Sequence, residues 1–322
     1  MALALCILGV GAHSLRAATR VETDKTVTIT ALVDLNDGSK FASDYNGKVE
    51  IELYKVASLD ESGNPKLTSN FENSGIDLTV LQNKPTVDDV KTAIVDKAIP
   101  VSESLEADKV ITLDREQQQT SASVPIEAGA GIYLYIPQPA EDDRYKYEFT
   151  PYVIYAPGSE YIASGQGSDE WNYDVSFKLK SSEERRYGTL VIRKVLDNYN
   201  IDLGTASFVY KIKAKLAEGT VVFDDVRTLD FERPETQELR IELPSTAIVT
   251  ITEANTGASY KVVGVATESD IEITGETTTT VEFENEYDDT KLISGGISAV
   301  NTFEKIDGEY VGHRTDSDER AR

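Results

Sequence analysis

Cysteine and histidine are almost absent from this sequence of 322 residues. It contains one cysteine, Cys6, and two histidines, His13 and His313, all close to an end of the chain. Disulfide bonds and thiol chemistry are therefore excluded from the body of the protein. Histidine-based general base catalysis and metal binding have no residue there either. We predict that the protein is not an enzyme, has no metal site and needs no cofactor.

Basic residues are scarce compared with acidic residues. The chain has 32 Lys and Arg against 56 Asp and Glu, which gives a formal net charge of −24. Nucleic acids and anionic membrane surfaces are themselves negative, so both are disfavoured as partners. The content of 40% hydrophobic residues and 16 tyrosines is typical of a folded protein. Together these features favour a soluble protein that works outside the cell.

The longest apolar run lies at the start of the chain. Residues 1–18, MALALCILGVGAHSLRAA, contain an apolar run followed by small residues, as in the core and cleavage region of a secretory signal. No basic residues precede the run, and the alternative is an apolar N-terminus of the folded protein. No later stretch is apolar enough to span a membrane. We predict a secreted or cell-surface protein, which could be associated with the cell wall.

Alternating apolar and polar residues predict strands for most of the chain. In residues 48–57, KVEIELYKVA, Val49, Ile51 and Leu53 share one face, and Tyr54 belongs to the other, polar face. Only one helix is predicted.

The predicted helix lies in the first half of the chain. Thr86 is a suitable N-cap residue, an apolar stripe begins at Val87, and Pro100 is expected to end the helix.

Charged residues 181–186, SSEERR, separate two strand-rich segments and are predicted to form a linker. The segments give a first domain over residues 24–182 and a second over residues 187–289, and residues 290–322 would form an extension and polar tail. In the second domain, short alternating segments separated by turn residues predict a β-sandwich. The predicted fold class is mostly β, with two tandem β-sandwich domains, the first with one short helix.

Three strands of the second domain each place one polar residue on an apolar face. These residues are Lys194 in LVIRKVL, Glu253 in IVTITE and Asn285 in VEFENEY. Burial would favour the neutral amine of Lys194 and the protonated carboxyl of Glu253. Lys194 could then attack the carboxamide carbon of Asn285, assisted by Glu253, and release ammonia. The sequence thus predicts a self-formed isopeptide bond between the first and last strands of the domain.

Other interpretations of these residues stay open. Lys194 could reach water along an edge of the sandwich, Glu253 could be a surface acid at a strand end, and Asn285 could bond only to local backbone. Asn301, in GGISAVNTF, is a rival acceptor because it also shares a face with apolar neighbours.

These strands resemble the Cna-B type, immunoglobulin-like domains of Gram-positive surface proteins and sortase-assembled pilins. The pattern lies in GTLVIRKV, VTITE and VEFENEY of the second domain. In the first domain, VEIELYKVA, GIYLYIP and YEFTPYVIYAP are similar to the N-terminal domain of such pilins. The resemblance implies a structural subunit of an adhesive pilus or fimbria, with a Lys194–Asn285 bond assisted by Glu253. It also implies other pilin subunits and a sortase as partners.

Pilins of this kind contain a WxxxVxVYPK motif, whose lysine a sortase joins to the C-terminal threonine of the next subunit. The segment WNYDVSFKLK matches the motif at Trp171, Val175 and Lys180, and departs from it at Lys178 and Leu179, where Tyr and Pro are expected. The resemblance implies Lys180 as the intersubunit lysine, on the solvent face of its strand. The alternative is an ordinary solvated lysine.

The resemblance further implies an LPxTG-like sorting motif, an apolar span and a basic tail near the C-terminus. The sequence after Asn301 contains none of these. The chain could be truncated, secreted without its own anchor, or polymerised by another route. The alternative function is a surface adhesin that binds a host protein or glycan without polymerising, for which the tyrosines would supply stacking surfaces.

Overall fold

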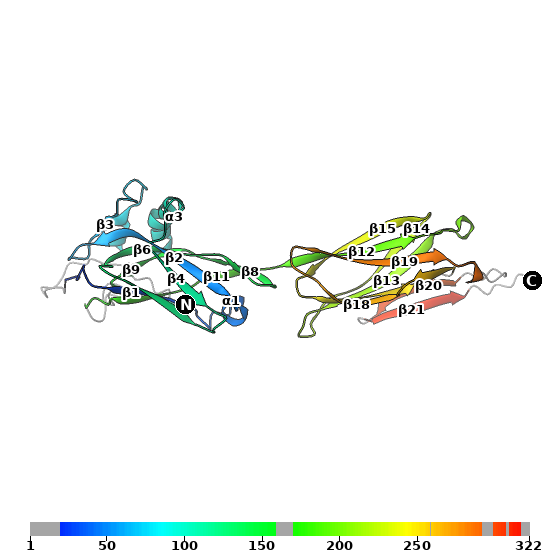
Figure 1. The fold of residues 1–322 in the computed structure, drawn as a ribbon. Helices are drawn as coiled ribbons and strands as arrows, with labels where there is room; N and C mark the ends of the chain where they lie inside the picture. The colour runs from blue at the N-terminus through cyan, green and yellow to red at the C-terminus, as the bar shows by residue number, and fades with distance from the viewer. Residues whose placement is uncertain (1–19, 159–169, 258, 292–298, 307–308, 317–322) are drawn as a thin grey trace, which may run out of the picture. The chain divides into compact units, whose positions relative to one another are not determined.

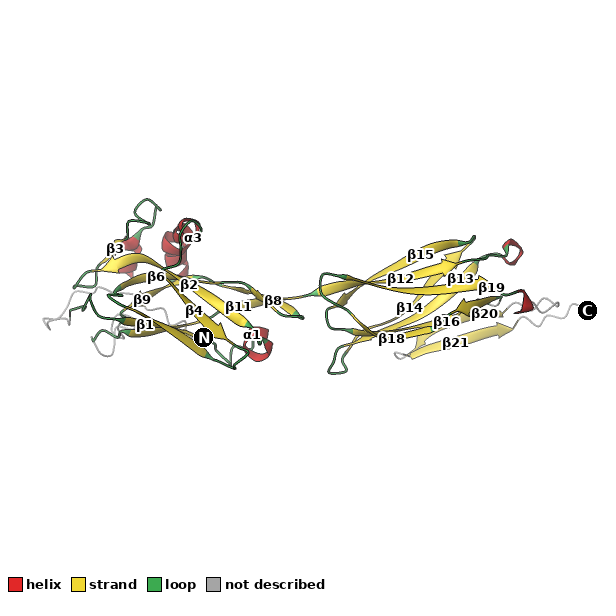
Figure 2. Ribbon diagram, in the orientation of Figure 1, coloured by secondary structure: helices red, strands yellow, loops and turns green. Residues whose placement is uncertain are grey.

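A computed structural model describes residues 20–158, 170–257, 259–291, 299–306 and 309–316, with side chains as far as residue 291 except that of Asn83. Strands make up most of this part of the chain, as the ribbon coloured by secondary structure shows (Figure 2). The mostly β fold class predicted from the sequence is confirmed. The predicted signal segment, residues 1–18, lies outside the described residues.

The chain divides into two compact units, the first ending at Glu184 and the second beginning at Arg185 (Figure 1). This boundary lies within the break predicted at residues 181–186, but the segment is not an irregular linker, because Ser181–Arg185 forms strand β11. This strand belongs to a three-stranded sheet of order β11-β8-β7, with β7 Ala140–Glu141 and β8 Tyr145–Phe149. An edge strand can pair through its backbone while its polar side chains stay in water, which explains why the sequence pattern missed it.

Two further sheets build most of the first unit. The larger has the order β3-β2-β6-β9, with β4 also paired to β2, and the smaller has the order β10-β1-β5. The bounds of these strands are β1 Val27–Leu32, β2 Lys48–Leu59, β3 Pro65–Leu67, β4 Lys109–Asp114, β5 Ser121–Ile126, β6 Gly131–Pro137, β9 Tyr152–Ala156 and β10 Asp174–Lys178.

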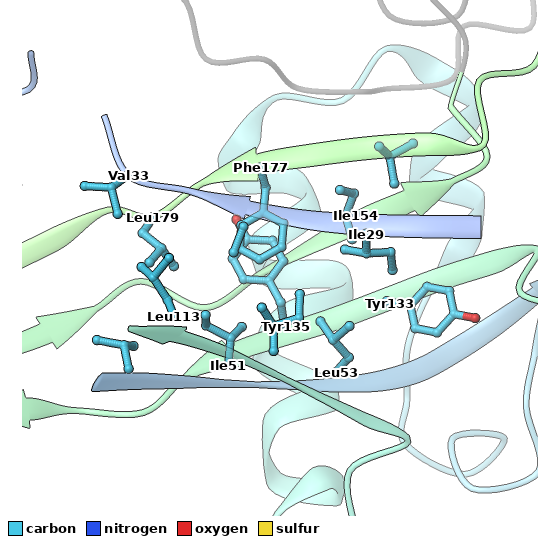
Figure 3. Packing of buried hydrophobic residues seen from close by; sticks show 14 of the residues in the cluster. Ile29, Val33, Ile51, Leu53, Leu113, Tyr133, Tyr135, Ile154, Phe177 and Leu179 are labelled. Carbon is cyan, nitrogen blue, oxygen red and sulfur yellow. The ribbon is translucent and has the colours of Figure 1, made fainter. Parts of the chain in front are cut away.

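The first core lies between these two sheets (Figure 3). Ile29 of β1 and Ile51 of β2 are completely buried in it. The rings of Tyr135 on β6 and Phe177 on β10 are stacked, with centroids 3.8 Å apart. Strand β1 pairs parallel with β10 and antiparallel with β5. This packing fixes the inner face of the strand that leads to Lys180.

A second core covers the opposite face of the larger sheet. Tyr54 and Val56 of β2 are buried there together with Val90 and Ile94 of the helical segment. The polar face predicted at Tyr54 is therefore wrong. A two-residue period finds one buried face of a strand, but β2 is covered on both faces.

The helical segment consists of α2 Val87–Val90, a π-helical turn η2 Lys91–Val95 and α3 Asp96–Ser102. Thr86 caps it as predicted, with Oγ1 accepting from the backbone N–H of Asp89 at 3.2 Å. Pro100 lies inside α3, so the prediction that it ends the helix is wrong. Close to the end of a helix, proline removes only one backbone donor. The remaining helices are short: α1 Lys40–Asp44, η1 Leu78–Asn83, η3 Ile201–Leu203 and η4 Asp289–Lys291.

The second unit is a sandwich of two four-stranded sheets around a single core. Their orders are β15-β12-β19-β17 and β14-β13-β16-β18, and every pair is antiparallel except β12 with β19. Strands β14 and β18, at sheet edges, were not predicted. The bounds are β12 Tyr187–Leu196, β13 Ala206–Lys215, β14 Val221–Phe231, β15 Glu235–Pro244, β16 Ile248–Asn255, β17 Tyr260–Val263, β18 Thr267–Glu272 and β19 Thr278–Tyr287.

The polar tail predicted for residues 290–322 contains an antiparallel hairpin of β20 Ala299–Ile306 and β21 Glu309–Asp316. The sequence between the two strands is Asp-Gly, a dipeptide typical of two-residue hairpin loops.

Candidate functional site

The first and last strands of the sandwich lie side by side. Strand β12 pairs parallel with β19, and the register places Lys194 opposite Phe283 and Leu196 opposite Asn285. Lys194 and Asn285 are therefore offset by one pleat on the same inner face. Both side chains are completely buried. Parallel pairing of terminal strands thus brings together two residues that the sequence separates widely.

Glu253 reaches the same point from the opposite sheet. It lies on β16, is 4% exposed, and is paired in register with Tyr210 of β13. The register between β13 and β16 shifts next to this pair, between Val209 and Tyr210. Such a β-bulge bends a strand and re-aims its side chains. The three polar residues predicted from the sequence accordingly meet inside one core.

The polar atoms of these residues form one connected group, the buried triad of Lys194, Glu253 and Asn285. Oε1 of Glu253 accepts a hydrogen bond from Nζ of Lys194 at 3.2 Å and another from Nδ2 of Asn285 at 2.9 Å. Nζ of Lys194 also donates to Oδ1 of Asn285. The amine therefore lies beside the carbonyl of the asparagine, with the carboxyl group in contact with both.

Burial shifts the pKa values of the two ionisable groups toward their neutral forms. Desolvation lowers the pKa of Lys194 to about 8, although the Glu253 carboxyl opposes this shift. Desolvation also raises the pKa of Glu253, again opposed by its partner. The 3.2 Å contact fits an ion pair equally well, but removing both charges from water is costly and favours the neutral pair. A neutral amine is the nucleophilic form of lysine.

Aromatic rings pack around the buried triad. Nζ of Lys194 lies 4.3 Å from the centre of the Phe208 ring, and the ring of Tyr210 packs against Phe283 with centroids 5.2 Å apart. Sequence reasoning did not single out Phe208 or Tyr210. Both are aromatic residues at inward positions of a strand, a pattern that ordinary core residues share, so the sequence contains no signal that distinguishes them.

Lys180 lies at the end of the segment that resembles the pilin motif. Tyr173, Val175, Phe177 and Leu179 are buried, whereas Lys180 is exposed, so the side chains alternate as expected. Its backbone carbonyl accepts from the N–H of Thr150 at 3.0 Å, next to β8.

The neighbouring lysine differs from Lys180 in its contacts. Nζ of Lys178 bonds to Asp34 at 2.7 Å. No ion pair to Lys180 is formed within the described part of the chain. The amine of Lys180 is thus accessible.

The rival acceptor Asn301 lies in the C-terminal hairpin. It is on β20, opposite Arg314 of β21, in a two-stranded sheet separate from the sheets of the sandwich. The structure describes the backbone of Asn301 but not its side chain. The side-chain hydrogen bonds that the structure describes for Lys194 are donated by its Nζ to Glu253 and Asn285.

The first unit has no comparable polar cluster among its described residues, where Ser102 and Asp114 are the buried polar residues. Nine tyrosines of the two units are buried, so they supply no stacking surface for a glycan.

No group of metal-ligating side chains occurs in the described ranges. The helices found in those ranges are also too short and too polar to cross a bilayer.

No protein-family model matches this chain, and no curated protein matches it. Among solved structures, the minor pilin GBS52 of Streptococcus agalactiae is similar with 16% identity and a TM-score of 0.25, over 84% of this chain and 100% of that one. The full-length major pilin SpaD of Corynebacterium diphtheriae has 10% identity and a TM-score of 0.27, over 83% and 98%.

A third similar structure is the TIE protein of Bacillus anthracis, with 13% identity and a TM-score of 0.35. The match covers 81% of this chain and 34% of that one. Identities and TM-scores this low transfer no residue role to the present chain. The chemistry of the site therefore rests on its own geometry.

Proposed function

We propose that this protein is a secreted or cell-surface structural subunit of a pilus-type fibre, and that its second unit staples itself with an isopeptide bond between Lys194 and Asn285. One observation supports the proposal above all: a lysine, a carboxyl group and an asparagine are in mutual contact inside an apolar core. Burying three polar side chains is costly. This costly arrangement is explained if two of the three side chains react to form a covalent bond.

The proposed reaction consumes no other reagent. Nζ of Lys194 attacks Cγ of Asn285, so that the Nζ–Cγ bond forms and the Cγ–Nδ2 bond breaks. Glu253 contacts Nζ and Nδ2 through Oε1. It starts as a protonated acid, gives its proton to Nδ2 and takes one from Nζ, so that one proton passes from the amine to the leaving group. Nδ2 leaves as ammonia, and Glu253 ends in the protonation state in which it began. The protein catalyses this step once, on itself.

The intact mass of the purified protein tests the bond. We expect the wild-type chain to be lighter than its sequence by one ammonia, and the Lys194→Ala and Glu253→Ala variants to have their full sequence masses. Lys215→Ala, at an exposed position of β13, should retain the deficit. A full wild-type mass would contradict the proposal. Peptide mapping of the linked fragment decides between Asn285 and Asn301 as the acceptor.

Lys180 is the proposed site of linkage to the next subunit by a sortase. Incubated with a sortase and a fluorescent peptide that contains an LPxTG motif, the wild-type protein is expected to become labelled. The amine of Lys180 would attack the enzyme-bound thioester and form an amide. Lys180→Ala should reduce labelling at least tenfold. Lys178→Ala is the matched control and should label normally, so equal labelling of all three proteins would rule out Lys180.

A further inference from the structure

Two polar atoms at the site, one in the triad and one in a neighbouring residue, have no hydrogen-bond partner among the described residues. They are Oε2 of Glu253 and the hydroxyl of Tyr210, and both are buried. Buried polar groups in folded proteins are almost always paired, because an unpaired group loses its bonds to water without replacement. Two such atoms in one core therefore call for a common explanation.

The two residues are neighbours across adjacent strands. Tyr210 and Glu253 are opposite each other in the register of β13 and β16, and both side chains face the core. Residues in such a pair have Cβ atoms about 5 Å apart. The Tyr210 ring packs on Phe283, the residue that precedes Asn285 on the same face of β19. The Tyr210 hydroxyl and the Glu253 carboxyl group thus lie in the same part of the core, close enough for Glu253 to add to desolvation in raising the pKa of Tyr210.

The hydrogen bonds of Glu253 decide where its proton lies. Oε1 already accepts from Lys194 and from Asn285, so the proton of the neutral acid must be on Oε2. A protonated Oε2 is a donor and needs an acceptor. Desolvation raises the pKa of Tyr210 above its ordinary value, so its hydroxyl is neutral and has a free lone pair. The two unpaired atoms are complementary.

We propose that Tyr210 is a positioning residue for the self-stapling reaction: its hydroxyl accepts the Oε2 proton of Glu253, directly or through one water, and keeps this carboxyl group protonated. The inference rests on the proposed isopeptide bond. A hydrogen bond to the neutral form of an acid raises its pKa. Tyr210 would thereby extend the pH range in which Glu253 can act as an acid, while Oε1 stays aligned with the reacting groups.

A further charged group, Glu284, lies on the outer face of β19 near the reaction centre. Glu284 lies between Phe283 and Asn285 and raises the pKa of Lys194. Bond formation needs neutral Lys194 and protonated Glu253 at the same time. The rate should therefore be highest at intermediate pH and fall on the alkaline side as the pair loses its last proton. By raising the pKa of Glu253, Tyr210 would raise the pH at which the rate begins to fall.

Tyr210→Phe tests the inference, since it removes the hydroxyl and keeps the ring on Phe283. The full chain is made by cell-free synthesis, transferred to buffers of different pH, and sampled over time for the loss of ammonia. We expect the alkaline fall of the pH–rate profile to begin about one pH unit lower than in wild type. At a fixed alkaline pH the rate should be about tenfold lower, which is the equivalent of one pKa unit. Tyr260→Phe, buried in the same core, should behave as wild type.

The outcomes separate this inference from the proposed function. If wild type loses no ammonia, the isopeptide bond itself is wrong. If wild type reacts and Tyr210→Phe has the same rate and pH profile, or is slowed equally at every pH, the role of Tyr210 is wrong.

A second measurement does not depend on the reaction. Two proteins that cannot form the bond are compared, Asn285→Ala alone and Asn285→Ala with Tyr210→Phe. The carbon-13 signal of the Glu253 carboxyl should titrate about one pH unit lower in the second protein. An unchanged titration would overturn the inference.

Discussion

Pulled from both ends until it is fully unfolded, the wild-type chain is expected to extend roughly 300 Å less than an Asn285→Ala variant. Lys194 and Asn285 are 91 residues apart in sequence, and each extended residue spans about 3.3–3.6 Å. Force enters the sandwich along β12 and leaves it along β19, which are parallel neighbours. The proposed bond joins these strands directly, so the chain between them is never stretched.

Single-molecule force spectroscopy measures this difference. Handles at both ends of the full chain give the total contour length, and unfolding of the first unit should contribute equally in every variant. Asn198→Ala replaces an exposed asparagine of the same sandwich and should extend like wild type. Equal total extension of wild type and Asn285→Ala would mean that no covalent bond bypasses the loop.

The inward positions of the triad follow from the sequence, and the complementary chemistry of its members predicted their contact, whereas the strand pairing that brings them together does not follow from it. A period of two places Lys194, Glu253 and Asn285 on buried faces without knowledge of the sheets. Which strands are neighbours depends on long-range pairing, and the parallel contact of β12 with β19 has no local signal. The role proposed for Tyr210 depends on register, here beside a bulge. A strand pattern contains no information about which residue it will face.

The errors elsewhere in the fold have related causes. Strands β11, β14 and β18 lie at sheet edges, where both faces can stay partly in water and the apolar alternation fades. Tyr54 is the opposite case, because its strand is covered on both faces. Periodicity therefore predicts strands with one buried face well, misses strands with no buried face, and assigns a polar face wrongly to a strand that is buried on both.

A cross-link in the second unit, with no comparable polar cluster among the described residues of the first, would suit the proposed fibre. Lys180 precedes the end of the first unit, Glu184, by only four residues. If the next subunit were joined to Lys180, tension would pass through residues 181–184 directly into β12. Most of the first unit would then lie outside the path of the force. A bond between terminal strands is needed only where the force crosses a sandwich from end to end.

Glu253→Gln is expected to lower the free energy of unfolding of the second unit by about 4 to 5 kcal/mol. Glutamine keeps the shape of the side chain but cannot exchange protons, so the bond should not form. Opening a loop with the Lys194–Asn285 separation of 91 residues restores chain entropy to the unfolded state by about this amount. Differential scanning calorimetry of the full chain should show the transition of the second unit roughly 20 to 35 °C lower.

Two further variants separate the bond from the packing of the site. Glu242→Gln makes the same substitution at an exposed position of β15 and should leave the transition unchanged. A triple variant, Lys194→Met with Glu253→Leu and Asn285→Leu, fills the site with apolar side chains. Replacing a buried polar group by packed apolar residues is often neutral or stabilising. The triple variant should therefore unfold at a higher temperature than Glu253→Gln but at a lower temperature than wild type. Better packing does not restrict the unfolded chain, whereas a covalent loop does. Wild-type stability in the triple variant would show that no bond contributes.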